Sequence, residues 1–169
     1  MSVVIDGSAS VTINSGAILG ITSSTAVAST SGTSIDFTSI PSWVKRITVM
    51  FNGVSTSGTS PVQIQIGSGS ITNSGYSGSC SYGTTTTNSS GFVVHSNIAA
   101  ATIAYGTVIL TNVSGNVWTE MGSIGAASNA VSVSGGGLTT LTGALDRVRI
   151  TTVNGTDTFD AGSINILYE

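Results

Sequence analysis

The stretch GTSIDFTSIPSWVKRITVMFNGV, residues 32–54, carries the strongest strand signal in the chain. Apolar side chains fall on odd positions in its second half: Trp43, Ile47, Val49 and Phe51. Lys45 interrupts this series. A period of two indicates a pleated β-strand with one buried face. Asn52-Gly53 predicts a tight turn that ends the strand, because both residues tolerate a positive φ.

The same pattern predicts a second strand near the C-terminus, Arg147–Val153. Its side chains alternate between two faces, with Val148 and Ile150 on one and Arg147 and Arg149 on the other. Asn154-Gly155 predicts the turn that ends it. We interpret these two stretches as the main strands of one sandwich.

The composition of the chain is unusually poor in charge. Charged residues make up 7% of its 169 residues, against about 25% in an average soluble domain. Ser, Thr, Gly and Asn provide most of the polar surface, a texture typical of secreted or virion-surface β-proteins. Four basic residues in total are too few to follow a phosphate backbone, so no nucleic-acid partner is expected. No apolar run approaches the ~18 residues of a membrane helix, so no membrane partner is expected.

Residues 1–31 are predicted to form a short N-terminal anchoring arm and linker, and residues 32–169 the sandwich domain. The arm holds short apolar runs, each closed by turn residues: Val3, Val4, Ile5, Val11, Ile13, Ile18 and Leu19. Such short strands bury too little surface to form their own core. The arm therefore needs its own domain, copies of itself around a symmetry axis, or a larger assembly. Residues 23–34 have the composition of a linker.

The N-terminus lacks a basic region followed by a continuous apolar run, so we expect synthesis in a cytoplasm rather than secretion. Cys80 is the single cysteine. It excludes a disulfide within the chain and is expected to be a passive small side chain rather than a reactive thiol.

The remainder of the body is predicted to consist of short strands separated by glycine-rich turns. The expected strands include Val62–Ile66, Gly91–His95, a hairpin of 107–113 with 117–121, a pair 130–133 and 138–141 around Gly135–Gly137, and Ser163–Tyr168. Residues 67–91 are predicted to be a long polar loop with short strands around Ile71 and Cys80–Tyr82. One helical turn is an alternative within the alanine-rich residues 97–105. This pattern indicates an all-β, antiparallel, jelly-roll-like β-sandwich.

His95 is the only histidine. The many serines make a Ser-His-Asp triad formally available, but no G-x-S-x-G elbow lies at a strand-to-helix junction. We expect His95 at a strand end, on the surface or hydrogen-bonded, and we expect no catalytic residue and no enzymatic activity.

The carboxylates give no convincing active site or metal site. A glycosidase needs two carboxylates on opposite walls of a cleft, whereas Asp157 and Asp160 share one turn. They are expected to bond local backbone N–H groups, with a calcium site as the alternative. No Cys/His cluster indicates zinc and no glycine-rich loop ends in the lysine of a phosphate site. We therefore expect no metal and no cofactor.

Basic and aromatic residues are the remaining candidates for contacts. Arg46, Arg147 and Arg149, with Lys45, are expected on neighbouring strands with Asp36 and Asp146 as ion partners. They are interpreted as edge or inter-subunit salt bridges, with contact to an acidic glycan or protein as the alternative. Tyr76, Tyr82 and Tyr105 lie among Ser, Asn and Thr, where they could stack on a sugar ring. The alternative is that they are single surface or interface tyrosines. Trp43 and Trp118 are expected to anchor the core or an interface.

Two segments carry a resemblance to a known family. Residues 32–67 and LDRVRITTVNGTDTFDAGSINILYE, residues 145–169, resemble the C-terminal β-sandwich domain of tail fibres and related virion-surface proteins of tailed bacteriophages. Residues 68–144 are similar mainly in their Ser/Gly/Thr texture. The resemblance implies a trimeric, non-enzymatic module displayed on the particle and often concerned with host-surface contact.

Fibres of this family place the domain after a long shaft, whereas residues 1–31 form only a short arm here. This difference favours a homotrimeric capsid decoration (cement) protein on the capsid exterior, made in the cytoplasm of the bacterial host. The arm, together with Trp43 and the arginines, would contact the major capsid protein or a neighbouring subunit, and the outer loops would contact host-surface polysaccharide weakly. The alternative is a tail fibre or tailspike tip that binds a receptor and contacts tail proteins.

Overall fold

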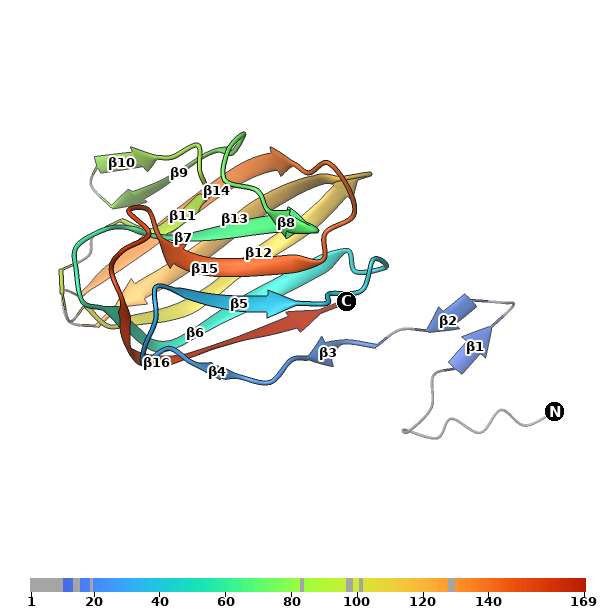
Figure 1. The fold of residues 1–169 in the computed structure, drawn as a ribbon, viewed down its shortest axis with the longest axis horizontal. Helices are drawn as coiled ribbons and strands as arrows, with labels where there is room; N and C mark the ends of the chain where they lie inside the picture. The colour runs from blue at the N-terminus through green and yellow to red at the C-terminus, as the bar shows by residue number, and fades with distance from the viewer. Residues whose placement is uncertain are drawn as a thin grey trace.

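Two antiparallel sheets face each other across a shared apolar interior in the structure, a computed structural model (Figure 1). It describes residues 11–13, 16–18, 20–82, 84–96, 99–100, 102–127 and 130–169. Every strand pairing within these residues is antiparallel and none of these residues is helical. The predicted all-β antiparallel fold is therefore confirmed, while its jelly-roll connectivity and its trimeric state stay predictions.

The larger sheet has nine strands. In spatial order they are β10 (Thr84–Thr87), β9 (Ser77–Tyr82), β14 (Val131–Thr140), β13 (Val117–Ala126), β12 (Ala104–Ser114), β6 (Arg46–Thr56), β16 (Phe159–Tyr168) and β3 (Thr22–Ser23), and β4 (Val27–Ala28) also pairs with β16. The β12–β13 hairpin confirms the predicted pair 107–113 and 117–121 and extends it at both strands.

The smaller sheet has five strands. In spatial order they are β11 (Phe92–His95), β7 (Val62–Ser68), β15 (Arg147–Thr152) and β5 (Ser34–Thr38), with β8 (Ser70–Ile71) also paired to β7. A separate two-stranded hairpin, β1 (Val11–Ile13) and β2 (Gly16–Ile18), belongs to neither sheet.

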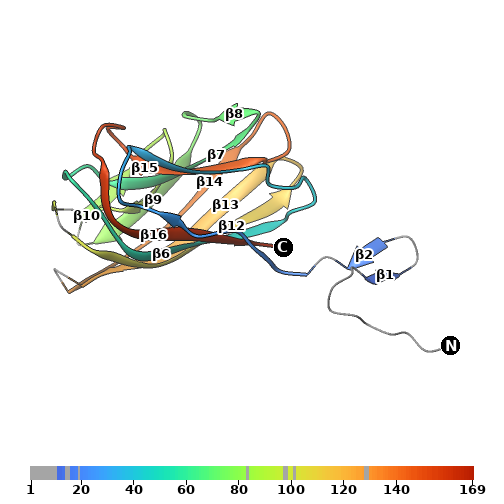
Figure 2. The ribbon, with the colours of Figure 1, turned by 60° about the horizontal axis from the view of Figure 1, so that its bottom comes forward.

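The interior lies between the two strands that the sequence singles out. Ile47 and Val49 of β6 and Val148 and Ile150 of β15 are each fully buried in one apolar cluster. β6 belongs to the nine-stranded sheet and β15 to the five-stranded sheet, and Figure 2 shows them in different layers. Burying one such side chain contributes roughly 1.5–3 kcal/mol. The prediction that these are the two main strands of one sandwich is confirmed.

The turn predicted at Asn52-Gly53 is wrong, because β6 runs on to Thr56. Asn52 pairs with Tyr105 and Val54 with Ala104, so Gly53 is left unpaired as a bulge with φ of 69°. A β-bulge bends its strand and increases the twist without ending it. By contrast, the turn predicted at Asn154-Gly155 is present, with Gly155 N–H donating to Thr152 O at 3.0 Å.

The turn predicted at Gly135–Gly137 is also wrong, because β14 is one continuous strand. Two of the glycines are there for close packing. A Cβ on Gly135 would lie 2.8 Å from the Cβ of Cys80, and a Cβ on Gly137 would lie 2.8 Å from Cδ1 of Phe92. The missing side chains let β9 and β11 approach β14 closely.

The polar stretch 67–91 contains more strand than the sequence indicates. β8 and β9 match the predicted short strands, and β10 adds a strand that was not predicted. In the alanine-rich stretch, the described residues show a turn rather than a helix, with Thr102 N–H donating to Ala99 O at 2.9 Å.

Candidate functional site

The segment before β5 is built into the edge of the nine-stranded sheet. Ser24 N–H donates to Ile166 O and Ser29 N–H donates to Gly162 O, both at 2.9 Å. Ser29 is fully buried, and its hydroxyl donates to Ala161 O at 2.8 Å. The prediction of a linker over residues 23–34 is therefore wrong for this part. This segment pairs with β16 through its backbone, so the pairing needs no alternation of apolar side chains. Composition alone therefore does not predict the pairing.

The chain toward the N-terminus leaves the sandwich. In both Figure 1 and Figure 2 the β1–β2 hairpin stands away from the two sheets. Val11 pairs with Ile18 in this hairpin, and Ile13 pairs with Gly16, which places three predicted anchors on it. Val3, Val4, Ile5 and Leu19 lie outside the described residues. Ile21, at the point of departure, is 68% exposed.

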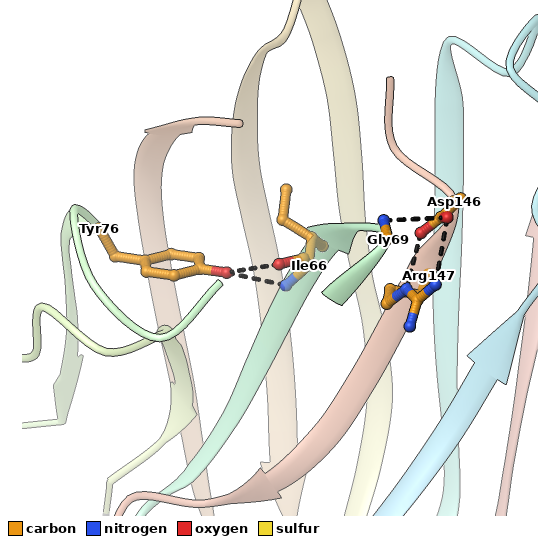
Figure 3. A network of polar contacts seen from close by, with 5 residues as sticks. All are labelled: Ile66, Gly69, Tyr76, Asp146 and Arg147. Atoms are coloured by element: carbon orange, nitrogen blue, oxygen red, sulfur yellow. Dashed lines mark hydrogen bonds and ion pairs between the residues drawn. The ribbon is translucent and has the colours of Figure 1, made fainter. Parts of the chain in front are cut away.

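The predicted ion partners of β15 are confirmed. Arg149 holds Asp36 of β5 through two hydrogen bonds of 2.7 Å. Arg147 holds its chain neighbour Asp146 at 2.7 and 3.2 Å, and Asp146 also accepts from Gly69 N–H at 3.0 Å (Figure 3). The hydrogen bond from Arg147 is the main cause that lowers the pKa of Asp146.

The other basic residues lie on the opposite layer. Arg46 of β6 pairs with Glu169 at 3.0 Å. Lys45 donates to Asn112 Oδ1 at 3.2 Å. The prediction that these residues neighbour Arg147 and Arg149 is wrong, since β6 and β15 belong to different sheets. Each arginine has an acidic partner within the chain, and a contact of these groups with another subunit stays a prediction.

The two tryptophans occupy different environments. Trp118 is buried in the core, which confirms one of the two predicted roles. Trp43 is half-buried against the core, with its ring centroid 6.0 Å from that of Tyr168. An interface role for Trp43 stays a prediction.

Tyr76 does not lie on the surface, so the predicted sugar contact at this residue is wrong. It is 5% exposed and packs edge-on against Phe92, with ring centroids 4.8 Å apart. Its hydroxyl accepts from Ile66 N–H at 2.8 Å and lies 3.1 Å from Ile66 O (Figure 3). Burial raises its pKa to about 12. Tyr76 therefore ties the polar stretch 67–91 to β7.

For Tyr82 and Tyr105, contact with a sugar stays a prediction. Tyr105 is 46% exposed on the outer face of β12. It faces a shallow depression beside Gly125 and Ser132. The side chain of Tyr82 lies outside the described residues.

Besides Tyr76, three further titratable side chains are buried among the described residues. His95 is 1% exposed, and neither of its ring nitrogens has a hydrogen-bond partner within the part of the chain that the structure describes. Burial lowers its pKa. His95 ends β11, as predicted, but it is neither on the surface nor hydrogen-bonded to a described residue, so that part of the prediction is wrong. Burial raises the pKa of Glu120 to about 7 and raises the pKa of the Cys80 thiol. Among the described residues, no three His, Cys, Asp or Glu side chains come together as a metal site.

The prediction that Asp157 bonds local backbone N–H groups is wrong, because its backbone donor lies on a distant segment and its local donor is a side chain. Its carboxylate accepts from Ser60 N–H at 3.0 Å and from Asn154 Nδ2 at 2.7 Å. Asp160 lies on β16 and accepts a hydrogen bond from the Ser55 hydroxyl. The two carboxylates thus serve different neighbours instead of sharing one site.

The outer face of the nine-stranded sheet is hollowed into an open trough of about 630 Å³. One cross-strand row along it is made only of hydroxyl residues: Thr107, Ser123, Ser134, Ser81 and Thr85. The neighbouring row contains Ile109 and Met121, and Met121 is 69% exposed. No charged residue among those that the structure describes lines the trough. The alternation of Ser and Thr along each strand was visible in the sequence, but the row across strands depends on the register.

Searches against protein-family models, curated proteins and solved structures find no match for this chain. Among the described residues, no helix has the length and apolar character needed to span a membrane.

Proposed function

We propose that this protein is a non-enzymatic assembly module of a tailed-bacteriophage virion, a trimeric capsid decoration protein that stabilises the head. The observation that carries the proposal is the division of the N-terminal segment. Residues 22–29 are fixed to β16, whereas the β1–β2 hairpin stands away from the sandwich. The resemblance of residues 32–67 and 145–169 to virion-surface domains is the reason for proposing that the larger assembly is a phage virion.

A free hairpin of this size needs a partner. Its two strands have three residues each, and an isolated two-stranded hairpin is marginally stable at best in water. A docking surface on a larger particle removes this instability, because main-chain pairing and apolar contacts then continue beyond the hairpin. We therefore assign the arm to attachment and the sandwich to the exposed part of the protein.

The outer face of the nine-stranded sheet supports association of the sandwiches with one another. It exposes apolar side chains on adjacent strands: Val113, Met121, Leu138 and Tyr105. Removing water from an uncharged surface of this kind costs little free energy. A stable contact buries about 800 Å² per partner. Three copies related by a three-fold rotation would bury these apolar side chains against one another in a closed ring. Weak attachment of each arm would then be multiplied threefold.

The second candidate function is a receptor-binding fibre tip. It is favoured by a polar hollow on the five-stranded sheet, which is lined by Gln65 and Arg149 among other residues. The two functions predict different losses when the protein is removed from virions. A decoration protein protects the head from heat and osmotic shock, whereas a fibre tip supports adsorption to the host.

The experiment that separates them compares virions with and without this protein. Loss of heat and osmotic resistance with normal adsorption supports decoration. Normal resistance with lost adsorption supports the fibre tip. Light scattering on the purified protein tests the trimer independently, since a monomer at micromolar concentration would contradict it.

A further inference from the structure

We infer that the outer face of the five-stranded sheet carries a binding site for a neutral sugar. A hollow of about 330 Å³ opens there over β15 and β7, which lie side by side in Figure 1. This volume is at the lower end of small-molecule sites. This hollow lies on a different sheet from the trough, and sugar binding there does not depend on where the protein sits on a particle.

The floor of the hollow follows from the strand register. Asp36, Arg149 and Gln65 form one cross-strand row over β5, β15 and β7. Ser34, Thr151 and Gln63 form the next row. Directly opposed side chains in such rows lie about 4.5–5.5 Å apart at Cβ. Planar amide and guanidinium groups are thereby arranged side by side on one surface.

Gln65 provides an acceptor that no described residue satisfies. Its side chain lines the hollow although the residue is only 7% exposed. Its Nε2 donates to Ser90 O at 2.8 Å, which fixes the orientation of the amide. Its Oε1 receives no hydrogen bond from the part of the chain that the structure describes. Oε1 stays accessible to solvent in the open hollow, since it is not one of the buried side-chain atoms that lack a partner. A ligand hydroxyl would therefore replace water at this acceptor.

Arg149 provides donors next to this acceptor. Its Nε and Nη2 are both engaged by Asp36 at 2.7 Å. Nη1 makes no hydrogen bond to a described residue, so its N–H groups are left for a ligand. Because Asp36 neutralises the guanidinium, the site favours an uncharged ligand over a carboxylate or phosphate. Of two adjacent sugar hydroxyls, one would donate to Gln65 Oε1 and the other would accept from Arg149 Nη1.

The wall of the hollow is held in place by a second buried amide. Gln63 is 2% exposed, and its Oε1 accepts from Asn88 Nδ2 at 2.6 Å and from Ser90 Oγ at 3.1 Å. Its Nε2 donates to Thr152 O at 3.3 Å. Gly91 lets the loop approach, because a Cβ there would lie 2.6 Å from Gln63 Oε1. The binding groups are therefore preorganised, which lowers the entropic cost of binding.

Within the described part of the chain no aromatic ring lines the hollow, so the ring face of a sugar gains no stacking from these residues. Binding by one protomer is consequently weak, and useful affinity would require several copies on one particle.

The test is a titration of the full chain, followed by two-dimensional ¹H–¹⁵N NMR, with glucose, galactose, N-acetylglucosamine and rhamnose. N-acetylneuraminic acid serves as the anionic comparison. We expect saturable shifts for at least one neutral sugar, confined to the backbone and side-chain amides around Gln65 and Arg149. Absence of saturable shifts for all four neutral sugars would overturn the inference, as would tighter binding of the anionic sugar.

Two variants locate the site. Gln65→Met removes the acceptor at similar volume and should weaken binding about tenfold. Asn73→Ala removes an exposed wall amide and should weaken binding without disturbing the sheet, so it remains informative if Gln65→Met misfolds. Ser134→Ala in the trough of the other sheet is the matched control and should leave binding unchanged. Shifts that persist in both hollow variants, or that vanish in Ser134→Ala, would contradict the site.

Discussion

Gly162 of β16 lies directly against the carbonyl oxygen of Gly53 in β6, so that two bulges on paired strands face each other. Both glycines have positive φ, 87° for Gly162 and 69° for Gly53. Ser163 pairs with Asn52 and Ala161 with Ser55 on either side of the defect. A Cβ on Gly162 would collide with Gly53 O. The paired bulges bend both strands together at the place where the sequence alone predicted a turn.

We predict that Gly162→Ala destabilises the sandwich by roughly 2–5 kcal/mol, from the left-handed backbone and the collision together. Gly155→Ala is the matched control. Gly155 has a similar φ of 68° but open space around its Cβ position, so only the backbone cost of roughly 1 kcal/mol is expected. Urea unfolding of the two variants measures the difference. Equal losses would show that the collision is absent.

The triplet Gly135–Gly137 allows a test within one strand. Gly137→Ala places a methyl group 2.8 Å from the Phe92 ring and should cost roughly 1–3 kcal/mol by overpacking. Gly136 points outward, where a Cβ would lie 3.5 Å from Glu120 O. Gly136→Ala should therefore be neutral or stabilise the strand by up to about 1 kcal/mol. Thermal unfolding of both variants provides the comparison, and an equal response would favour a turn at this place.

Tyr76→Phe should cost roughly 1–3 kcal/mol, because Ile66 N–H loses its acceptor inside the protein. Tyr105→Phe changes an exposed ring and should alter stability by less than about 0.5 kcal/mol. Chemical denaturation checks both values. A neutral Tyr76→Phe would mean that the hydroxyl does not tie the polar stretch to β7.

Glu120 should make the protein less stable as pH rises. Its folded-state pKa of about 7 lies above the ordinary 4.5, so the folded protein keeps a proton that the unfolded chain releases. The stabilising effect is full below about pH 4.5 and is lost as pH rises through 7, by roughly 3 kcal/mol. Unfolding of wild type and Glu120→Gln across this range measures it. The opposite contribution of His95 is common to both proteins and cancels, so parallel curves would contradict the prediction.

The arm should divide at residue 20. A chain of residues 21–169 keeps β3, β4 and the buried Ser29 and should be as stable as the full protein. A chain of residues 32–169 loses this pairing, exposes the edge of β16 and should be less stable and prone to association. Circular dichroism melting and light scattering compare the two. Equal stability would show that residues 22–29 are dispensable to the fold.

Periodicity was a reliable guide where one face of a strand is buried. It correctly placed β6, β15 and the β12–β13 hairpin, because alternation of apolar and polar residues reflects burial directly. It failed at glycine, since the same residue serves as a turn at Gly155, a bulge at Gly53 and a close contact at Gly137. These uses differ only in which residues of the neighbouring strand face the glycine. The local sequence around the glycine does not contain that information.

The polar hollow could be predicted only in part. Gln63 and Gln65 alternate with Ile64 and Ile66, which indicates that they share one face of β7. Their burial was not expected, because it comes from loop residues packed over the sheet. The neighbourhood of Gln65 and Arg149 depends on the pairing of β7 with β15, which brings together residues far apart in the chain. Similarly, Tyr76 resembled an exposed aromatic in a polar loop until its contact with Ile66 was known.

In the proposed function, the arm attaches this sandwich to the outside of a phage head. Cryo-electron microscopy of virions, with the protein identified by a Fab fragment against the sandwich, tests it most directly. We expect trimers at local three-fold positions of the capsid, with the β1–β2 hairpin against the capsid protein and the loops outward. Labelling confined to the tail, or monomers without contact through residues 1–20, would contradict it.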